Sequence, residues 1–183
     1  MTFIKTDIKY WIGADESNHG VVPEIYVAVL STNPNDVKRS PEIIGKQRKK
    51  VGIETILSSE QDFRFMVLEN EHFRRIGRLS IKVPTIAQLI EGFSSQIEIT
   101  KTSIIIDGKD QQFPLLEELI PIVGDMFHTE LSSRRFRQEK DGDRHYPLVN
   151  IADRMAYQLK LIYENLRSGQ KGPFDEKRVY LRL

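Results

Sequence analysis

The sequence predicts an α/β fold, a mixed sheet of about five strands flanked by helices. Strand-like and helix-like segments follow one another in the order strand, strand, strand, helix, strand, helix, strand, helix. The chain has 183 residues, of which 39% are hydrophobic and 29% charged, the usual profile of a soluble globular protein. There is no internal repeat, so we expect a single domain over residues 1–183, with residues 167–183 as a flexible C-terminal extension.

The first half of the chain supplies three predicted strands. Residues 6–16 carry apolar side chains at both even and odd positions, which predicts a strand buried on both faces. A turn at Asn18-His19-Gly20 leads to a β-branched run at residues 25–30, which we expect to pair antiparallel with the first strand. Residues 63–68 form a third candidate strand, and residues 78–83 fit either a further strand or an extended connector.

The second half predicts alternating helices and strands. Pro84 is expected in the first turn of a helix that ends near Gln96. The unbroken apolar run at residues 102–107 predicts a central strand. The remaining expected elements are a helix at 114–123, a short strand at 126–131, a helix at 147–166 and an edge strand or partner contact at 179–181.

Four carboxylates fall where buried elements are predicted, although an unpaired buried charge is costly. Asp15 and Glu16 follow one apolar run, Asp107 follows another, and Asp153 lies in the last predicted helix. Hard divalent cations with oxygen ligands would balance these charges. Successive strand residues face opposite sides of a sheet, so Glu16 would join Asp15 only if the strand ends or bends there.

Each of these acidic residues also has a purely structural explanation. Asp15 and Glu16 could end a strand as turn formers, and Asp107-Gly108 is a common turn dipeptide. Asp153 could pair with Arg154. Further acidic residues precede the last helix as candidate ligands, but a solvated loop explains them more simply: Glu130, Asp141 and Asp143.

The element order and the acidic residues resemble those of the ribonuclease H-like superfamily. Residues 13–20, Gly-Ala-Asp-Glu-Ser-Asn-His-Gly, are similar to the first ribonuclease HII motif, G-I-D-E-A-G-R-G, and Ile106-Asp107-Gly108 resembles its V-D-G. A closer likeness is to uncharacterised RNase H-like proteins with a leading D-E-S and a late A-D, here Ala152-Asp153. The resemblance implies a metal-dependent nuclease whose catalytic and metal-binding residues are Asp15, Glu16, Asp107 and Asp153.

The resemblance also implies two Mg²⁺ or Mn²⁺ ions and a two-metal hydrolysis of RNA, DNA or a hybrid. In ribonuclease HII the G-R-G turn reads the 2′-hydroxyl at an RNA–DNA junction. This chain has Asn18-His19-Gly20 there, so we carry over the carboxylates and not that specificity. A non-catalytic RNase H-like module that binds nucleic acid or a protein is the alternative, and an unrelated α/β protein is a third possibility.

The formal net charge is only +1, so a nucleic-acid surface must be a local basic patch. Basic residues gather at 46–50, at 74–78 and just before the last helix, although each group could simply be solvated surface. The last group is predicted to bind nucleic acid because of its position: Arg134, Arg135, Arg137 and Lys140. Phe136, between arginines, could stack on a base.

Several other classes of site are excluded. The chain has no cysteine, so it forms neither disulfides nor thiolate metal sites. The motifs of P-loop proteins, dinucleotide-binding domains, serine hydrolases and zinc proteases are missing. No apolar leader or membrane-length apolar run occurs, and we expect a cytoplasmic protein that does not contact membranes.

Overall fold

The computed structural model describes residues 7–17, 22–41, 52–108, 114–166 and 170–182. Five strands form one mixed sheet in the order β3-β2-β1-β4-β5, which confirms the predicted fold class. β1 pairs antiparallel with β2, and β2 with β3, whereas β4 runs parallel to β1 and β5 parallel to β4. The strands are β1 (Tyr10–Ser17), β2 (Glu24–Ser31), β3 (Gln61–Leu68), β4 (Thr102–Asp107) and β5 (Phe136–Glu139).

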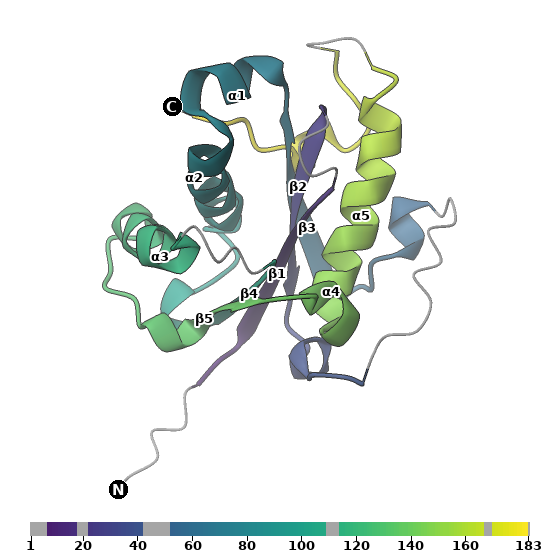
Figure 1. Cartoon of the computed structure of the whole chain (residues 1–183). Helices are drawn as coiled ribbons and strands as arrows, with labels where there is room; N and C mark the ends of the chain where they lie inside the picture. Colours follow the sequence, from purple (N-terminus) through teal and green to yellow (C-terminus); the bar gives the residue numbers. More distant parts are fainter. Residues whose placement is uncertain (1–6, 18–21, 42–51, 109–113, 167–169, 183) are drawn as a thin grey trace, which may run out of the picture.

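Helices cover both faces of the sheet (Figure 1). α2 and α3 lie on one face, and α4 and α5 lie on the other. The helices are α1 (Asn70–Ile76), α2 (Arg78–Glu91), α3 (Leu115–Met126), α4 (Gly142–His145) and α5 (Pro147–Tyr163). None of the helices in the described ranges has the length and apolar character that crossing a membrane requires.

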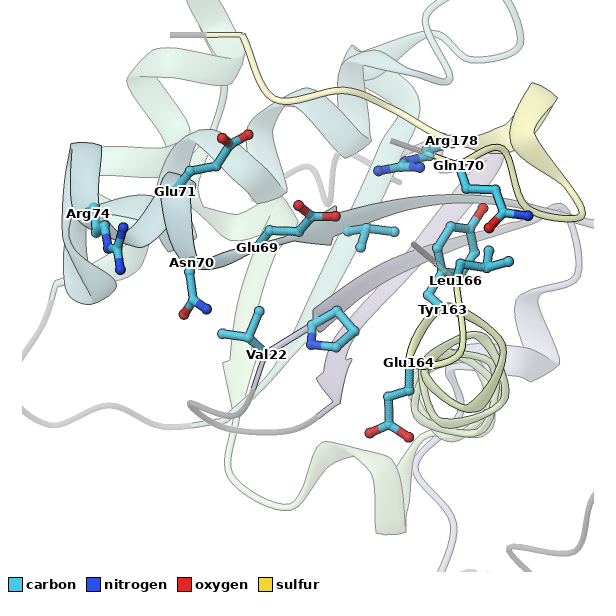
Figure 2. Close-up of a pocket in the computed structure, with 12 residues that line it drawn as sticks. Val22, Glu69, Asn70, Glu71, Arg74, Tyr163, Glu164, Leu166, Gln170 and Arg178 are labelled. Carbon is cyan, nitrogen blue, oxygen red and sulfur yellow. The ribbon is translucent and has the colours of Figure 1, made fainter. Parts of the chain in front are cut away.

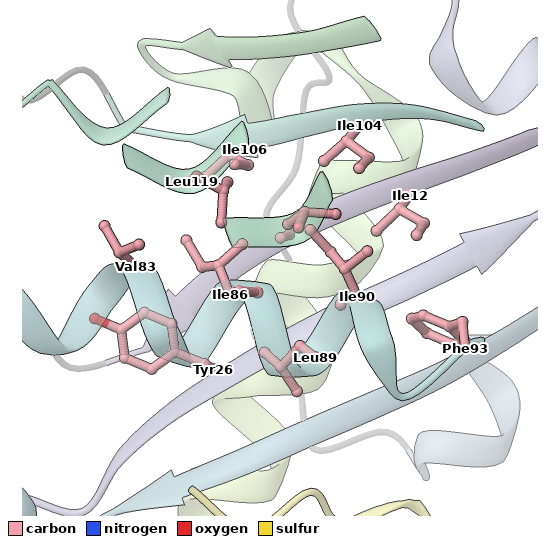
Figure 3. Packing of buried hydrophobic residues seen from close by; sticks show 14 of the residues in the cluster. Ile12, Tyr26, Val83, Ile86, Leu89, Ile90, Phe93, Ile104, Ile106 and Leu119 are labelled. Carbon is pink, nitrogen blue, oxygen red and sulfur yellow. The ribbon is translucent and has the colours of Figure 1, made fainter. Parts of the chain in front are cut away.

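The core has two main parts, one on each face of the sheet. On the α2 side, Ile86, Ile90 and Phe93 pack against Ile12 and Ile104 of the central strands (Figure 3). On the α5 side, a second cluster joins alternate residues of β2 and β3 to the buried stripe of the helix. The central strands are therefore buried on both faces, as their apolar runs predicted.

The expectation that Pro84 begins a helix was wrong. α2 begins six residues earlier, at Arg78, and Pro84 lies inside it. Residues 78–83 are therefore helical, and neither a strand nor a connector. Ile81 and Val83 are fully buried against the sheet, and this tertiary packing outweighs the backbone hydrogen bond that proline cannot make.

The short strand expected at residues 126–131 was also wrong. Met126 ends α3, and the chain turns through His128, which has a left-handed φ of 53°. The last strand is β5 instead, within the stretch that had been interpreted as polar loop. β5 is an edge strand with an exposed Arg137, so it lacks the apolar pattern of the central strands.

Residues 170–182, here called the tail, pack against the outer edge of the sheet. The Val179 backbone N–H donates to the Phe65 carbonyl at 2.8 Å, and Arg178 forms an isolated bridge with Phe65. Gln88 of α2 exchanges two hydrogen bonds of 2.8 Å with the Arg182 backbone. In Figure 1 the yellow tail leaves α5, passes β3 and ends beside α1 and α2. The flexibility expected of residues 167–183 stays a prediction.

Candidate functional site

Asp15 lies near the end of β1, on the face covered by α5. A Cβ atom at Gly13 would lie 2.9 Å from the Leu148 carbonyl carbon, so β1 and α5 are in direct contact there. Alternate strand residues share a face, and Asp15 therefore points to the same side as Gly13. Only 5% of Asp15 is exposed, and its Oδ1 accepts a 2.7 Å hydrogen bond from the Glu16 backbone.

Asp107 ends the neighbouring strand β4 and faces the same side. Ile105, two residues earlier, packs against Tyr146 and against Val149 of α5. Asp107 Oδ1 accepts a hydrogen bond of 3.3 Å from the backbone of Asp143. A Cβ atom at position 142 would lie 3.1 Å from that same oxygen, so Gly142 allows the close approach of α4.

Asp153 lies on α5, half-buried beside residues that pack on the sheet. Burial raises the pKa of Asp15 well above its usual value, and the charges of Asp107, Glu16 and Asp153 raise it further. Burial and the charge of Asp143 likewise raise the pKa of Asp107. Asp15, Asp107, Asp143 and Asp153, here called the acidic face, thus carry charges that repel one another.

Glu16 points to the opposite face of the sheet from Asp15. It shares the parity of Ile12 and Ala14, which pack toward α2. Its Oε1 lies 2.9 Å from Lys82 Nζ on α2, and the Glu16 side chain is 9% exposed. β1 continues in register with β2 through Ser17. Glu16 is therefore next to Asp15 in sequence, but its carboxylate lies on the α2 side of the sheet.

The acidic face fits a hard divalent cation in charge and in donor chemistry. Its donors are carboxylate oxygens, which Mg²⁺ and Mn²⁺ prefer, and a cation would relieve the repulsion that raises the pKa of Asp15. Among the described residues, however, no three His, Cys, Asp or Glu side chains stand close enough together to hold an ion as they are arranged. Binding would therefore require these carboxylates to draw together.

Asp143 was expected in a solvated loop, and the structure buries it instead, with 5% exposed. It lies in α4, and Asn150 Nδ2 donates a 2.9 Å hydrogen bond to its carbonyl. A helix of four residues has no periodic pattern, so the sequence carried no signal for this placement. The other candidates remain apart: Glu130 is exposed near the end of α3, and Asp141 is exposed before α4.

The predicted basic residues surround β5 with different exposures. Arg134, Arg137 and Lys140 are exposed, whereas Arg135 is half-buried. Arg137 pairs with Ile105 in the parallel register, so it projects to the same face of the sheet as Asp107. Phe136 is buried in the core on the α2 side, which rules out its predicted stacking on a base. Residues 18–20 and 46–50 lie outside the described residues.

The fold is similar to that of solved structures. One is a mutant protein of Bst-RNase HIII, with a TM-score of 0.52, 16% identity, and cover of 84% of this chain and 53% of that one. Another is ribonuclease H2 from Pyrococcus horikoshii OT3, with a TM-score of 0.50, 14% identity, and cover of 91% of this chain and 83% of that one. The chain has a ribonuclease H-like fold.

The likeness is one of fold, because identities of 16% and 14% are too low to carry residue roles. The chain spans about half the length of the Bst-RNase HIII chain. No protein-family model matches the sequence, and no curated protein matches it either. The function must therefore be argued from this chain's own site.

Proposed function

We propose that the chain is a metal-dependent nuclease that hydrolyses phosphodiester bonds of RNA, DNA or an RNA–DNA hybrid. The observation that carries the proposal is a buried Asp15 whose pKa is raised by burial and by the charges of Asp107 and Asp153 from separate elements. A carboxylate kept among like charges is costly to the fold, and such sites are often functional. The RNase H-like fold of the chain is consistent with this chemistry.

Asp15, Asp107 and Asp153 would hold Mg²⁺ or Mn²⁺, with two ions as our expectation. When bound, these cations supply a Lewis acid that lowers the pKa of a water molecule and stabilises the leaving oxygen. In this proposal the protein would supply the ligands from three elements: Asp15 from β1, Asp107 from the neighbouring strand β4, and Asp153 from α5. Asp143 holds Asp107 through its backbone N–H and is a further candidate ligand.

Glu16 has a different role in this proposal. Because Lys82 holds its carboxylate on the α2 side, Glu16 contributes charge near Asp15 without being placed as a ligand. Its replacement by glutamine should therefore change metal binding less than the same type of change at Asp15. The matched pair Glu16→Gln and Asp15→Asn tests this distinction.

The exposed basic residues near β5 would contact the phosphates of the substrate. Arg134, Arg137 and Lys140 are the accessible members of that group, whereas Arg135 is half-buried. Each phosphate contact that is lost should lower the dependence of affinity on salt. Replacing Arg134 and Arg137 by glutamine should weaken binding and flatten its salt dependence by about two units of slope.

A non-catalytic binding module is the second candidate. Two observations favour it. Glu16 is paired with Lys82, and no three of the described carboxylates are arranged to hold an ion. Such a module would bind nucleic acid but leave it intact.

The deciding experiment measures cleavage and metal binding together. Single-stranded and duplex RNA, DNA and hybrid are incubated with Mg²⁺, Mn²⁺ or EDTA, and unfolding is followed in the same buffers. We expect cleavage only with metal, a rise in melting temperature with metal, and loss of both in Asp15→Asn and Asp107→Asn. Metal binding without cleavage of any substrate would favour the binding module, and an equal thermal shift in Asp15→Asn would place the ion elsewhere.

A further inference from the structure

A cavity of about 410 Å³ opens where β2 starts and β3 ends (Figure 2). Asp15 lies toward the same end of these strands, near the end of β1. The lining of the cavity comes from the residues just before β2, the end of β3, α1, the end of α5 with the residues that follow it, and the tail. The volume falls within the range of small-molecule sites. The chemistry proposed for the acidic face does not use this cavity.

The cavity lies close to the acidic face. Val67, which lines it, pairs with Ile25, and Asp15 pairs with Val27, so Val67 lies two strands across and two residues along from Asp15. Strand spacing and rise put their Cα atoms roughly 12 Å apart. Val67 packs in the cluster that contains the buried stripe of α5, so both residues face the α5 side.

The walls combine both signs of charge with apolar patches. Pro23 and Leu166 supply apolar surface, and the amides of Asn70 and Gln170 supply donors and acceptors. The charged groups in the lining are Glu69, Glu71, Glu164, Arg74 and Arg178. With three carboxylates and two guanidiniums, the lining disfavours a phosphate but matches a flat heterocycle that both donates and accepts hydrogen bonds.

Part of the wall is held rigidly. The Arg178 guanidinium lies 5.3 Å from the ring centroid of Tyr163 and 4.7 Å from that of Tyr180. A Cβ atom at Gly172 would lie 2.6 Å from the Tyr163 ring, so the tail packs directly on α5. These contacts fix the Arg178 side of the cavity before any ligand arrives.

We propose that the cavity receives one unpaired base of a nucleic-acid strand whose phosphodiester backbone crosses the acidic face. This inference rests on the proposed function. Carboxylates accept from the exocyclic amine of cytosine, adenine or guanine, and uracil has no such amine, so uracil should bind least well. A stacked strand advances about 3.4 Å per nucleotide, so the base should lie about three or four nucleotides from the bond at Asp15.

The test uses the full chain carrying Asp15→Asn, so that no substrate is consumed. Binding to a single-stranded RNA about 16 nucleotides long is measured by fluorescence anisotropy, with one abasic nucleotide moved along the strand and, separately, with cytosine replaced by uracil. We expect one position where the abasic change weakens binding about tenfold and where uracil weakens it to a lesser extent. Adding Arg74→Gln should weaken binding to the intact strand and remove that positional effect.

Arg75→Gln is the matched control, because Arg75 is exposed on the same helix and does not line the cavity. It should change affinity less than twofold and keep the positional effect. Tight binding with a flat abasic scan would overturn the base pocket while leaving nucleic-acid binding intact. If no strand binds although the wild-type protein binds Mg²⁺, both the pocket and the nucleic-acid substrate are refuted.

Discussion

At the scale of single residues, Asp15 shows how the fold works against ionisation. Burial and three neighbouring acidic groups raise its pKa, so the native protein binds a proton more tightly than the unfolded chain does. By linkage, stability without metal should fall as pH rises from the unfolded pKa, about 4, through the folded pKa. At higher pH the full cost remains, and a bound cation would offset it.

We therefore expect Asp15→Asn to stabilise the metal-free protein at a pH of about 7.5, by about 1 kcal/mol or more. The substitution keeps the shape of the side chain and removes the charge, and its advantage should shrink toward a pH of about 4. Urea unfolding in EDTA near pH 4.5 and near pH 7.5 measures both effects. Asp125→Asn, at an exposed site on α3, is the control, and a gain that is equal at both pH values would contradict the electrostatic explanation.

The sequence predicted the placement of some of these acidic residues better than that of others. The apolar runs before Asp15 and Asp107 predicted where both carboxylates would lie, because a buried strand fixes the position of its last residue. Strand alternation alone left open which face of the sheet the Glu16 side chain takes. In the structure it lies on the α2 side and pairs with Lys82, a partner that is distant in sequence. Asp143 left no signal, because its burial comes from the packing of α4 against Asp107.

At the scale of elements, the acidic face depends on a close contact between β1 and α5. Gly13 leaves room for the backbone of Leu148, and Asp153 on the same helix is near enough for its charge to raise the pKa of Asp15. The geometry of the acidic face therefore rests on a glycine two residues before Asp15.

Gly13→Ala should destabilise the protein by about 1–3 kcal/mol, because an added methyl group would overlap Leu148. Chemical denaturation measures the loss, and Mg²⁺ should then raise the melting temperature less than in the wild type. Two of the three closest atoms belong to the Leu148 backbone, so Leu148→Ala should not rescue the variant. Wild-type stability of Gly13→Ala would show that α5 shifts without cost.

The predicted elements failed where tertiary packing overrides local rules. Pro84 was placed at a helix start because proline fits the first turn, yet buried Ile81 and Val83 extend α2 in front of it. β5 was missed because an edge strand needs little apolar character. The strongly apolar central strands were found because burial on both faces leaves a clear pattern.

At the scale of the whole molecule, a charged contact joins the tail to β3, far away in the sequence. Lys177 Nζ lies 2.7 Å from Asp62 Oδ1, and Gln96 also donates to this carboxylate. Partial burial alone would raise the pKa of Asp62, but these hydrogen bonds outweigh it and lower the pKa to about 2. The effect on stability is thus opposite in sign to that of Asp15.

Asp62 should stabilise the protein above a pH of about 4, and the contribution should be lost as pH falls from about 4 to about 2. We expect Asp62→Asn to cost about 1 kcal/mol at a pH of about 6, a reduced value because the group is partly exposed. Thermal unfolding near pH 6 and near pH 2.5 should show a clearly smaller difference at the lower pH, because most of the contribution is lost between the unfolded and the folded pKa. Glu117→Gln, on the exposed surface of α3, is the control, and a difference that is just as large at the lower pH would point to lost packing.

The contact between Gly13 and Leu148 also bears on how the protein is made. β1 leaves the ribosome early, whereas α5 is among the last elements to be synthesised. Until α5 emerges, the apolar residues Ile25, Val27 and Val29 of the nascent sheet have no cover on that side. During translation this apolar surface can bind chaperones or aggregate, until α5 packs on it.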